Sequence, residues 1–280
     1  MTLSGKAKLA GILGWPVSHS LSPRLHGFWL NEYDLDGAYL PLAVAPENLK
    51  QVLSALPLMG FQGVNLRVPH KVAALEIVDE LTDVARRIGA INTVFINPDG
   101  RLTGTNTDGE GFLASLREGA SSWQPDEGPA GVLGAGGAAR AVLVALIDAG
   151  VPNIRLFNRS REGAEALAAA LGGPNHVFDW DNRNDHLDGA VLLVNTTTLG
   201  MQGQPPLDIS LDGLRATAVV TDLVYAPLQT GLLIQARERY LTTVDGLGML
   251  LHQAVPGFEG WFGRRPEVSA RLRTHLLEAA

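Results

Sequence analysis

The chain has 280 residues, a formal net charge of −7 and no cysteine. Without a thiol it can form no disulfide, thiolate metal site or cysteine nucleophile, and its acidic balance without a basic run argues against nucleic acid as a partner. Its apolar runs are shorter than the roughly 20 residues of a membrane span, so we expect a soluble, cytoplasmic protein; at roughly 100 to 200 residues per domain, we expect two domains.

Short apolar runs alternate with longer helical patterns, which predicts an α/β protein built from βαβ units around a largely parallel sheet. The predicted strands are 8–13, 38–43, 63–68, 130–133, 153–158, 190–195 and 218–222. The predicted helices are 46–56, 72–87, 138–149, 163–171 and 229–239. A segment with glycine, serine and proline at 119–128 indicates a connection between domains and divides the chain near residue 120.

The third predicted strand belongs to the segment GVNLRVPHK, residues 63–71. Side chains alternate along a strand, so Asn65 and Arg67 should point away from the core. The side chains expected to face the core are Val64, Leu66 and Val68.

Lys71 follows this strand closely. Pro69 suits the first turn of a helix, which would place Lys71 near the positive end of the helix dipole. In a cleft that position favours the neutral amine, the form that a general base needs. A solvated surface lysine is the alternative interpretation.

A second polar cluster lies in GTNTDGEGF, with Asn106, Thr107 and Asp108, and Asn92 lies upstream in GAINTV. Asn, Asp and Gly are also common turn residues, so turn chemistry is the alternative. Spacing does not show that Asp108 meets Lys71. The histidines form no HxxxH or HExxH pair, and we predict no metal site.

Residues 130–150 read AGVLGAGGAARAVLVALIDAG, a short apolar strand, a glycine turn and an alanine-rich helix. This is the GxGxxA form of the dinucleotide fingerprint, with Gly134 for the turn, Gly136 for approach to a pyrophosphate and Ala139 for close packing. The amino end of the helix would supply N–H groups to the phosphates. A glycine turn that only packs helix on sheet is the alternative.

The end of the next strand indicates which dinucleotide is bound. An NAD site would carry an acidic residue there, whereas this chain has Asn158, Arg159, Ser160 and Arg161. A guanidinium can bind a 2′-phosphate bidentately, so the sequence favours NADP. Ordinary solvated loop charges are the alternative.

Taken together, the motifs resemble the shikimate dehydrogenase family, NADP-dependent enzymes of aromatic amino-acid biosynthesis. The likeness runs from about residue 11 to residue 263. Its nine blocks, in family order, are GWPVSHSLSP, GVNLRVPHK, GAINTV, GTNTDGEGF, GAGGAAR, NRS, VNTTTLGM, DLVYAPLQT and DGLGMLLHQAVPGFEGWFG.

The resemblance implies roles for substrate and cofactor residues. On the substrate side it implies that Ser20 and Ser22 bind the carboxylate through their hydroxyls and that Lys71 and Asp108 are the catalytic pair. It also implies that Asn92 and Gln253 bind the ring hydroxyls and that Tyr225 lines the cleft. On the cofactor side it implies that the pyrophosphate turn consists of Gly134, Ala135, Gly136, Gly137 and Ala138. The adenosine-phosphate loop would be Asn158, Arg159 and Ser160. Leu223 and Gly246 would lie beside the nicotinamide, and Asp83 near the cleft.

The resemblance also implies two α/β lobes. The first would be a substrate-binding catalytic domain with a mainly parallel sheet, residues 1–118 plus 246–280, because the C-terminal helices return to it. The second would be a Rossmann-type NADP domain, residues 119–245.

Three positions depart from the family pattern. Arg67 replaces a threonine that contacts a substrate hydroxyl, and on the face of Asn65 it could enter the pocket as a charged clamp. Gly27 replaces an asparagine. Gly163 replaces a basic residue, so either Arg161 substitutes for it or the NADP preference is weaker.

The leading hypothesis is therefore a dehydrogenase that interconverts shikimate and 3-dehydroshikimate with NADP. A paralogue acting on quinate or a related cyclic hydroxy acid is the main alternative, and a non-catalytic dinucleotide sensor is a second one. The sequence leaves the oligomeric state open, with a homodimer as one candidate.

Overall fold

The computed structural model describes residues 3–278, which form two compact units. Unit 1 runs to Thr107 and resumes at Gln253, and unit 2 is Asp108–His252. The predicted α/β fold with two lobes, the first of which regains the C-terminal helices, is confirmed. The division falls at other residues than the predicted domain limits of 118/119 and 245/246. It lies directly before the helix Asp108–Gly119 and within the helix Gly246–Phe262.

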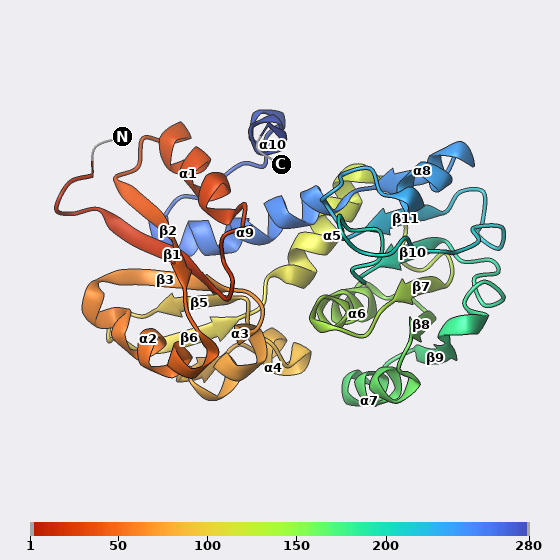
Figure 1. Ribbon diagram of the computed structural model, residues 1–280, viewed down its shortest axis with the longest axis horizontal. Helices are drawn as coiled ribbons and strands as arrows, with labels where there is room; N and C mark the ends of the chain where they lie inside the picture. Colours follow the sequence, from red (N-terminus) through yellow and green to blue (C-terminus); the bar gives the residue numbers. More distant parts are fainter. Residues whose placement is uncertain (1–2, 279–280) are drawn as a thin grey trace. The chain divides into compact units, whose positions relative to one another are not determined.

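The sheet of unit 1 is mixed. Within its described residues the strands are β1 (Lys8–Gly14), β2 (Gly37–Ala43), β3 (Phe61–Leu66), β4 (Glu80–Leu81), β5 (Thr93–Ile96) and β6 (Leu102–Thr105). Their order is β2-β1-β3-β5-β6-β4 (Figure 1). β1 is parallel to β2 and β3, and β4 to β6, whereas β5 is antiparallel to both neighbours.

The helices of unit 1 cover both faces of this sheet. They are α1 (Ser22–Glu32), α2 (Leu49–Ala55), α3 (His70–Ala73), α4 (Asp83–Ile88) and α10 (Ala270–Leu277), with 3₁₀ turns η1 (Pro46–Asn48), η2 (Pro57–Met59) and η3 (Ala74–Glu76). The second half of α9 (Gly246–Phe262) also belongs to unit 1. One face buries Leu13, Val64 and Leu66 in an aliphatic core. The other carries an aromatic cluster in which Trp261 of α9 donates its indole N–H to the carbonyl of Val94 at 3.2 Å.

The sheet of unit 2 is entirely parallel. Its strands in the described chain are β7 (Ala130–Leu133), β8 (Ile154–Asn158), β9 (Asn175–Asp179), β10 (Leu192–Asn195), β11 (Val219–Asp222) and β12 (Thr242–Val244). Their order, β12-β11-β10-β7-β8-β9, is the doubly wound order of dinucleotide-binding domains, in which the strand sequence reverses beside β7 (Figure 1). Ligands bind such sheets at the carboxyl ends of the strands near this reversal.

Helices cover both faces of the unit 2 sheet. They are α5 (Asp108–Gly119), α6 (Gly137–Ala149), α7 (Arg161–Leu171), α8 (Gly231–Glu238) and the first half of α9, with the 3₁₀ turn η4 (Trp180–Asn182). Val132 packs in one core and the next residue, Leu133, in the other. Burial on both faces explains why the strands of this unit read as continuous apolar runs in the sequence.

The predicted helix 72–87 is wrong. The chain there forms the single turn α3, the 3₁₀ turn η3, the short strand β4 and then α4. Glu80 pairs with Thr103 of β6, and the Thr82 hydroxyl caps α4 by accepting a hydrogen bond from the N–H of Ala85 at 3.3 Å. A sheet partner distant in sequence and a local cap thus replace a continuous helix.

β3 ends two residues earlier than predicted. Val68, expected on the core face, lies beyond the strand and is 71% exposed. Asn65, expected to point away from the core, is buried because α1 and α9 cover its face of the sheet. Within residues 3–278, no helix is long and apolar enough to cross a membrane.

Candidate active site

Two serines, Ser20 and Ser22, lie at the amino end of α1. The Ser20 hydroxyl accepts a hydrogen bond from the N–H of Ser22 at 3.3 Å, which fixes the turn that opens the helix. Ser22 is buried, whereas Ser20 is half-buried. Both residues were predicted to hold a carboxylate, and the amino end of an 11-residue helix favours negative charge.

A buried polar network begins at Tyr39 on β2. Its hydroxyl donates to Oδ1 of Asn65 at 2.6 Å and is also hydrogen-bonded by Ser22. Burial raises the pKa of Tyr39 well above its ordinary value of 10.0, and the bond from Ser22 opposes this shift. The phenol therefore stays neutral and keeps the proton that it donates to Asn65. Sequence reasoning missed Tyr39 because only the register of β2, β1 and β3 brings it to Asn65.

Replacing Tyr39 by phenylalanine should lower the free energy of unfolding by about 1–3 kcal/mol, because it leaves the Asn65 carbonyl buried without its donor. Urea denaturation of the variant and the wild type measures this difference. Tyr240→Phe is the matched control, since Tyr240 is 95% exposed and its loss of a hydroxyl should change nothing. Equal destabilisation by both substitutions would contradict a stabilising role for the Tyr39–Asn65 hydrogen bond.

The network continues to Asn92, which adjoins β5. Asn92 accepts hydrogen bonds at Oδ1 from the Thr107 N–H and the Thr93 hydroxyl, both at 2.9 Å. Its Nδ2 donates to the Thr107 hydroxyl at 3.0 Å and to Oε1 of Gln253 at 3.4 Å. The structure thus brings together Asn92 and Gln253, two predicted substrate ligands that are 161 positions apart.

Lys71 lies on α3, a helix of four residues. Pro69 occupies the position before this helix rather than its first turn, and a single turn has little dipole, so the expected helix-dipole effect on Lys71 is not supported. The Lys71 carbonyl accepts the Ile91 N–H at 2.8 Å, which anchors its backbone to the segment before Asn92. Asp108, the predicted partner of Lys71, is buried in the first turn of α5 and belongs to unit 2.

Arg67 lies directly after β3, and its N–H donates to the carbonyl of Leu13 at 3.0 Å. Its stem crosses Gly14, where an added Cβ would lie 2.8 Å from Arg67 Cδ. Glycine at position 14 therefore makes room for the arginine stem. The pairing of β1 with β3 ends at Leu66, one residue before Arg67, so the place of Arg67 on the face of Asn65 stays a prediction.

A pocket of about 360 Å³ lies in unit 2, at the carboxyl ends of β7, β8 and β10. Three of the fingerprint residues line it, together with the last residue of β8 and the residue that follows: Gly134, Ala135, Gly136, Asn158 and Arg159. Its other walls were not predicted: Trp180, Thr196, Thr197, Thr198, Leu199, Gln204 and Pro205. The threonines follow a buried strand at the reversal of strand order, a position that could have identified them.

The glycine turn has the geometry expected of a phosphate cradle. Gly134 has a φ of +104°, and an added Cβ would lie 2.7 Å from the Thr196 hydroxyl. A Cβ at Gly136 or Gly137 would meet nothing within 4 Å, so the amino end of α6 is open. Ala139 is fully buried against the strand, as predicted.

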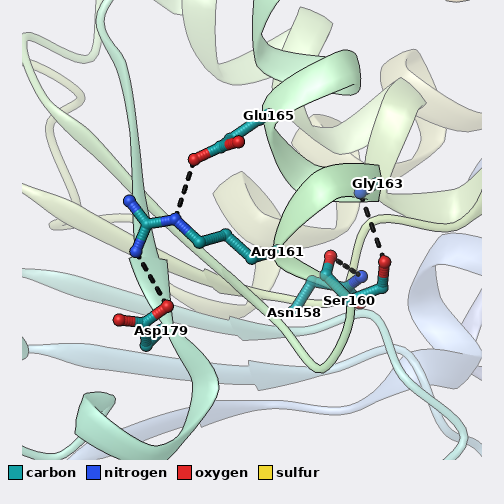
Figure 2. A network of polar contacts seen from close by, with 6 residues as sticks. All are labelled: Asn158, Ser160, Arg161, Gly163, Glu165 and Asp179. Carbon is teal, nitrogen blue, oxygen red and sulfur yellow. Dashed lines mark hydrogen bonds and ion pairs between the residues drawn. The ribbon is translucent and has the colours of Figure 1, made fainter.

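The two arginines after β8 differ in their surroundings. Arg161 donates to Glu165 and to Asp179, each at 2.7 Å, and its guanidinium points toward these carboxylates and away from the Asn158–Ser160 turn (Figure 2). Arg159 lines the pocket, and within residues 3–278 no hydrogen bond or ion pair engages its guanidinium. Ser160 caps α7 by accepting the Gly163 N–H at 3.3 Å, so its hydroxyl already has a structural role (Figure 2).

The loops after β10 and β11 are joined by Asn195 and Asp222. Asn195 donates to Oδ1 of Asp222 at 2.9 Å, and the same oxygen accepts the Val224 N–H at 3.0 Å. Burial raises the pKa of Asp222, while its bonds from Thr230, Val224 and Asn195 lower it.

This pair fixes the segment that carries the predicted residues Leu223 and Tyr225, both half-buried. Gly246 packs on the same segment, where an added Cβ would lie 2.7 Å from the Val224 carbonyl oxygen. Asp83 is exposed at the start of α4 in unit 1 and does not line the unit 2 pocket, so its role stays a prediction.

Known proteins resemble the chain over its whole length. The family descriptions that match are "Shikimate dehydrogenase substrate binding domain" at residues 12–94 and "Shikimate 5'-dehydrogenase C-terminal domain" at residues 246–270. A relative from Paramagnetospirillum magneticum, named shikimate dehydrogenase (NADP(+)), is 63% identical over 98% of this chain and 100% of its own length.

Solved structures agree with these matches. The shikimate 5-dehydrogenase of Listeria monocytogenes, in complex with shikimate and NAD, has a TM-score of 0.90 at 32% identity, covering 99% of this chain and 98% of that one. The quinate dehydrogenase of Corynebacterium glutamicum, in complex with NAD, has a TM-score of 0.89 at 31% identity, covering 97% and 99%. The resemblance inferred from the nine sequence blocks is confirmed, and the chain belongs to the shikimate dehydrogenase family.

Proposed function

We propose that this chain is an NADP-dependent shikimate dehydrogenase, which interconverts shikimate and 3-dehydroshikimate on the route to chorismate and aromatic amino acids. The observation that carries the proposal is Arg159 in the pocket of unit 2, whose guanidinium has no partner among the described residues. The chain is also 63% identical to a relative named for that activity with NADP(+). At this position an NAD site would place a carboxylate, which would repel a 2′-phosphate.

The residues of unit 2 fit the cofactor. The open amino end of α6 and the Gly134 turn suit a pyrophosphate, and Arg159 suits a 2′-phosphate. Ala135, Gly136, Gly137, Ala138, Asn158 and Ser160 complete the expected cofactor set, and Leu223 and Gly246 are assigned to the nicotinamide side. When bound, NADP⁺ supplies the hydride acceptor.

Arg159 rather than Arg161 should determine NADP affinity. We expect Arg159→Ala to raise the Kd for NADP by roughly 10- to 100-fold, the scale of a lost charge-assisted bond, without changing the Kd for NAD. Arg161→Ala should leave both constants near their wild-type values, because Glu165 and Asp179 already engage that guanidinium. Calorimetric titration measures all four constants, and a larger loss in Arg161→Ala would reverse the assignment.

Unit 1 supplies the substrate groups. Ser20 and Ser22 hold the carboxylate at the amino end of α1, and Asn92 and Gln253 hold ring hydroxyls. During oxidation the proton of the reacting hydroxyl passes to the Lys71 amine, either directly or with Asp108 as a coupled partner, and in the reverse reaction the ammonium returns it.

Arg67 keeps quinate as the second candidate substrate. A guanidinium there adds positive charge on the face of Asn65, and a quinate dehydrogenase is among the similar structures. Initial rates with shikimate and quinate, each with NADP and NAD, test the proposal. We expect the highest kcat/KM with shikimate and NADP. A higher kcat/KM with quinate would identify the chain as a quinate dehydrogenase instead. In that case the substrate preference of Arg67→Thr would show whether the arginine is responsible. The cytoplasmic location and the homodimer stay predictions.

A further inference from the structure

Trp180 lies beside Arg159 at one edge of the unit 2 sheet. Asn158, the last residue of β8, pairs with Asp179, the last residue of β9, so the next residues of the two strands are Arg159 and Trp180. Both line the dinucleotide pocket. Trp180 is the one aromatic side chain among the residues that line it.

Arg183 and the apolar core of unit 2 hold the indole in place. The Arg183 guanidinium stacks over the Trp180 ring at 4.7 Å from the centroid and donates to the Trp180 carbonyl at 2.7 Å. Arg183 also donates through Nε and Nη2 to the carbonyl of Asp208, at 3.1 and 2.6 Å. Trp180 packs in addition against the apolar core of this sheet face. A ring fixed in this way loses little conformational entropy when a ligand lies against it.

The remaining lining residues suit other parts of a dinucleotide. Glycine N–H groups and the arginine suit phosphates, and the threonines can hydrogen-bond sugar or phosphate oxygens. A purine needs a flat apolar surface, because stacking on an aromatic side chain is worth roughly 1–3 kcal/mol per base. Only Trp180 offers such a surface in this pocket.

We propose that Trp180 is the wall against which the adenine ring of the dinucleotide stacks. The proposal rests on the cofactor assignment above and adds a specific recognition residue to it. In this arrangement the adenine lies over the carboxyl ends of β8 and β9. It is then next to Arg159, the residue assigned to the 2′-phosphate, because Arg159 and Trp180 follow paired residues of the two strands.

Binding of adenosine 2′,5′-bisphosphate, which carries the adenine and the 2′-phosphate but no nicotinamide, tests this proposal without turnover. We expect Trp180→Ala to raise its Kd by about 5- to 150-fold, the range given by the stacking energy, and Trp180→Phe to retain most of the affinity. Trp180→Leu keeps apolar bulk without an aromatic face, so it should bind like the alanine variant; binding like wild type in the leucine variant would overturn the stacking role. Nicotinamide mononucleotide, which lacks adenine, should bind all variants equally.

Tryptophan fluorescence gives an independent readout. Adenosine 2′,5′-bisphosphate should quench the wild-type signal, and the quench should disappear in Trp180→Phe but persist in Trp15→Phe, a control at an exposed tryptophan of unit 1. If the wild type binds the bisphosphate and oxidises shikimate with NADP while Trp180→Ala binds equally well, only the role of Trp180 is wrong. If the wild type itself fails to bind the bisphosphate, the cofactor assignment fails instead.

Discussion

Replacing Lys71 by alanine should lower kcat for shikimate oxidation about 100-fold or more, the scale expected for loss of a general base. Lys71 sits on the single turn α3 in unit 1, whereas the dinucleotide pocket lies in unit 2, so the Kd for NADP should stay at the wild-type value. Steady-state kinetics and calorimetric titration with NADP separate the two effects.

Two further variants distinguish proton transfer from a general effect of charge. Lys71→Arg keeps the positive charge, but a guanidinium does not lose its proton in proteins, so it should be nearly as inactive as the alanine variant. Lys50→Ala removes an exposed lysine of α2 in the same unit and should be fully active. Near-normal turnover in Lys71→Ala, or recovery in Lys71→Arg, would remove Lys71 from the role of base.

The dinucleotide half could be predicted well from sequence because its determinants are local. β7, the glycine turn and α6 are contiguous, and the φ of +104° at Gly134 is a conformation that glycine adopts readily. Pockets at the reversal of strand order follow from this topology. The sequence therefore located the glycine turn and Arg159, which line the pocket of unit 2, without any long-range information.

The errors arise where distant residues decide the local structure. The segment 72–87 contains helical spacing, but Glu80 and Leu81 pair with β6, and that pairing cannot be seen within the segment. Trp180 follows β9, a partly exposed strand that was not predicted, so its approach to Arg159 was hidden as well. Arg161 was grouped with Arg159 by sequence, yet two acidic side chains hold it elsewhere, and one of them is Asp179 of β9 (Figure 2).

The substrate half depends more strongly on the resemblance. Ser20, Ser22, Lys71 and Asn92 have residue types that turns and surfaces also use, so their chemistry alone does not identify a site. For Asn92 the structure adds a physical argument. Tyr39, Asn65 and Asn92 form one buried hydrogen-bonded network, in which the neighbours of each carboxamide fix its orientation. Such a network orients polar groups before a ligand arrives.

The aromatic cluster of unit 1 should make its stability depend on pH. His26 is fully buried, and its ring stacks on Tyr39 at 3.9 Å between centroids. Neither ring nitrogen has a hydrogen-bond partner among the described residues. Burial lowers the pKa of His26 from 6.5 to about 3, because the surrounding rings cannot solvate an imidazolium.

The sign of the effect follows from proton binding. Below pH 6.5 the unfolded chain takes up a proton at this histidine, whereas the folded protein stays neutral there until about pH 3. The unfolded state therefore binds more protons in this window, and the free energy of unfolding should fall by about 1.4 kcal/mol for each unit that the pH decreases. Over the window the loss approaches roughly 4 kcal/mol, a large part of the 5–15 kcal/mol typical of a folded protein.

His26→Phe isolates this contribution from the carboxylates, which also titrate at acid pH. Phenylalanine keeps a ring against Tyr39, cannot be protonated and removes the two unpaired nitrogens, so the variant should be at least as stable as wild type at neutral pH. Urea denaturation across the window should show the advantage of the variant growing by about 1.4 kcal/mol per unit of acidification. His19→Phe, at an exposed histidine of the same unit, should follow the wild-type curve. Parallel curves for His26→Phe and wild type would mean that the folded protein accommodates the imidazolium, and the cluster would then have to open to water at acid pH.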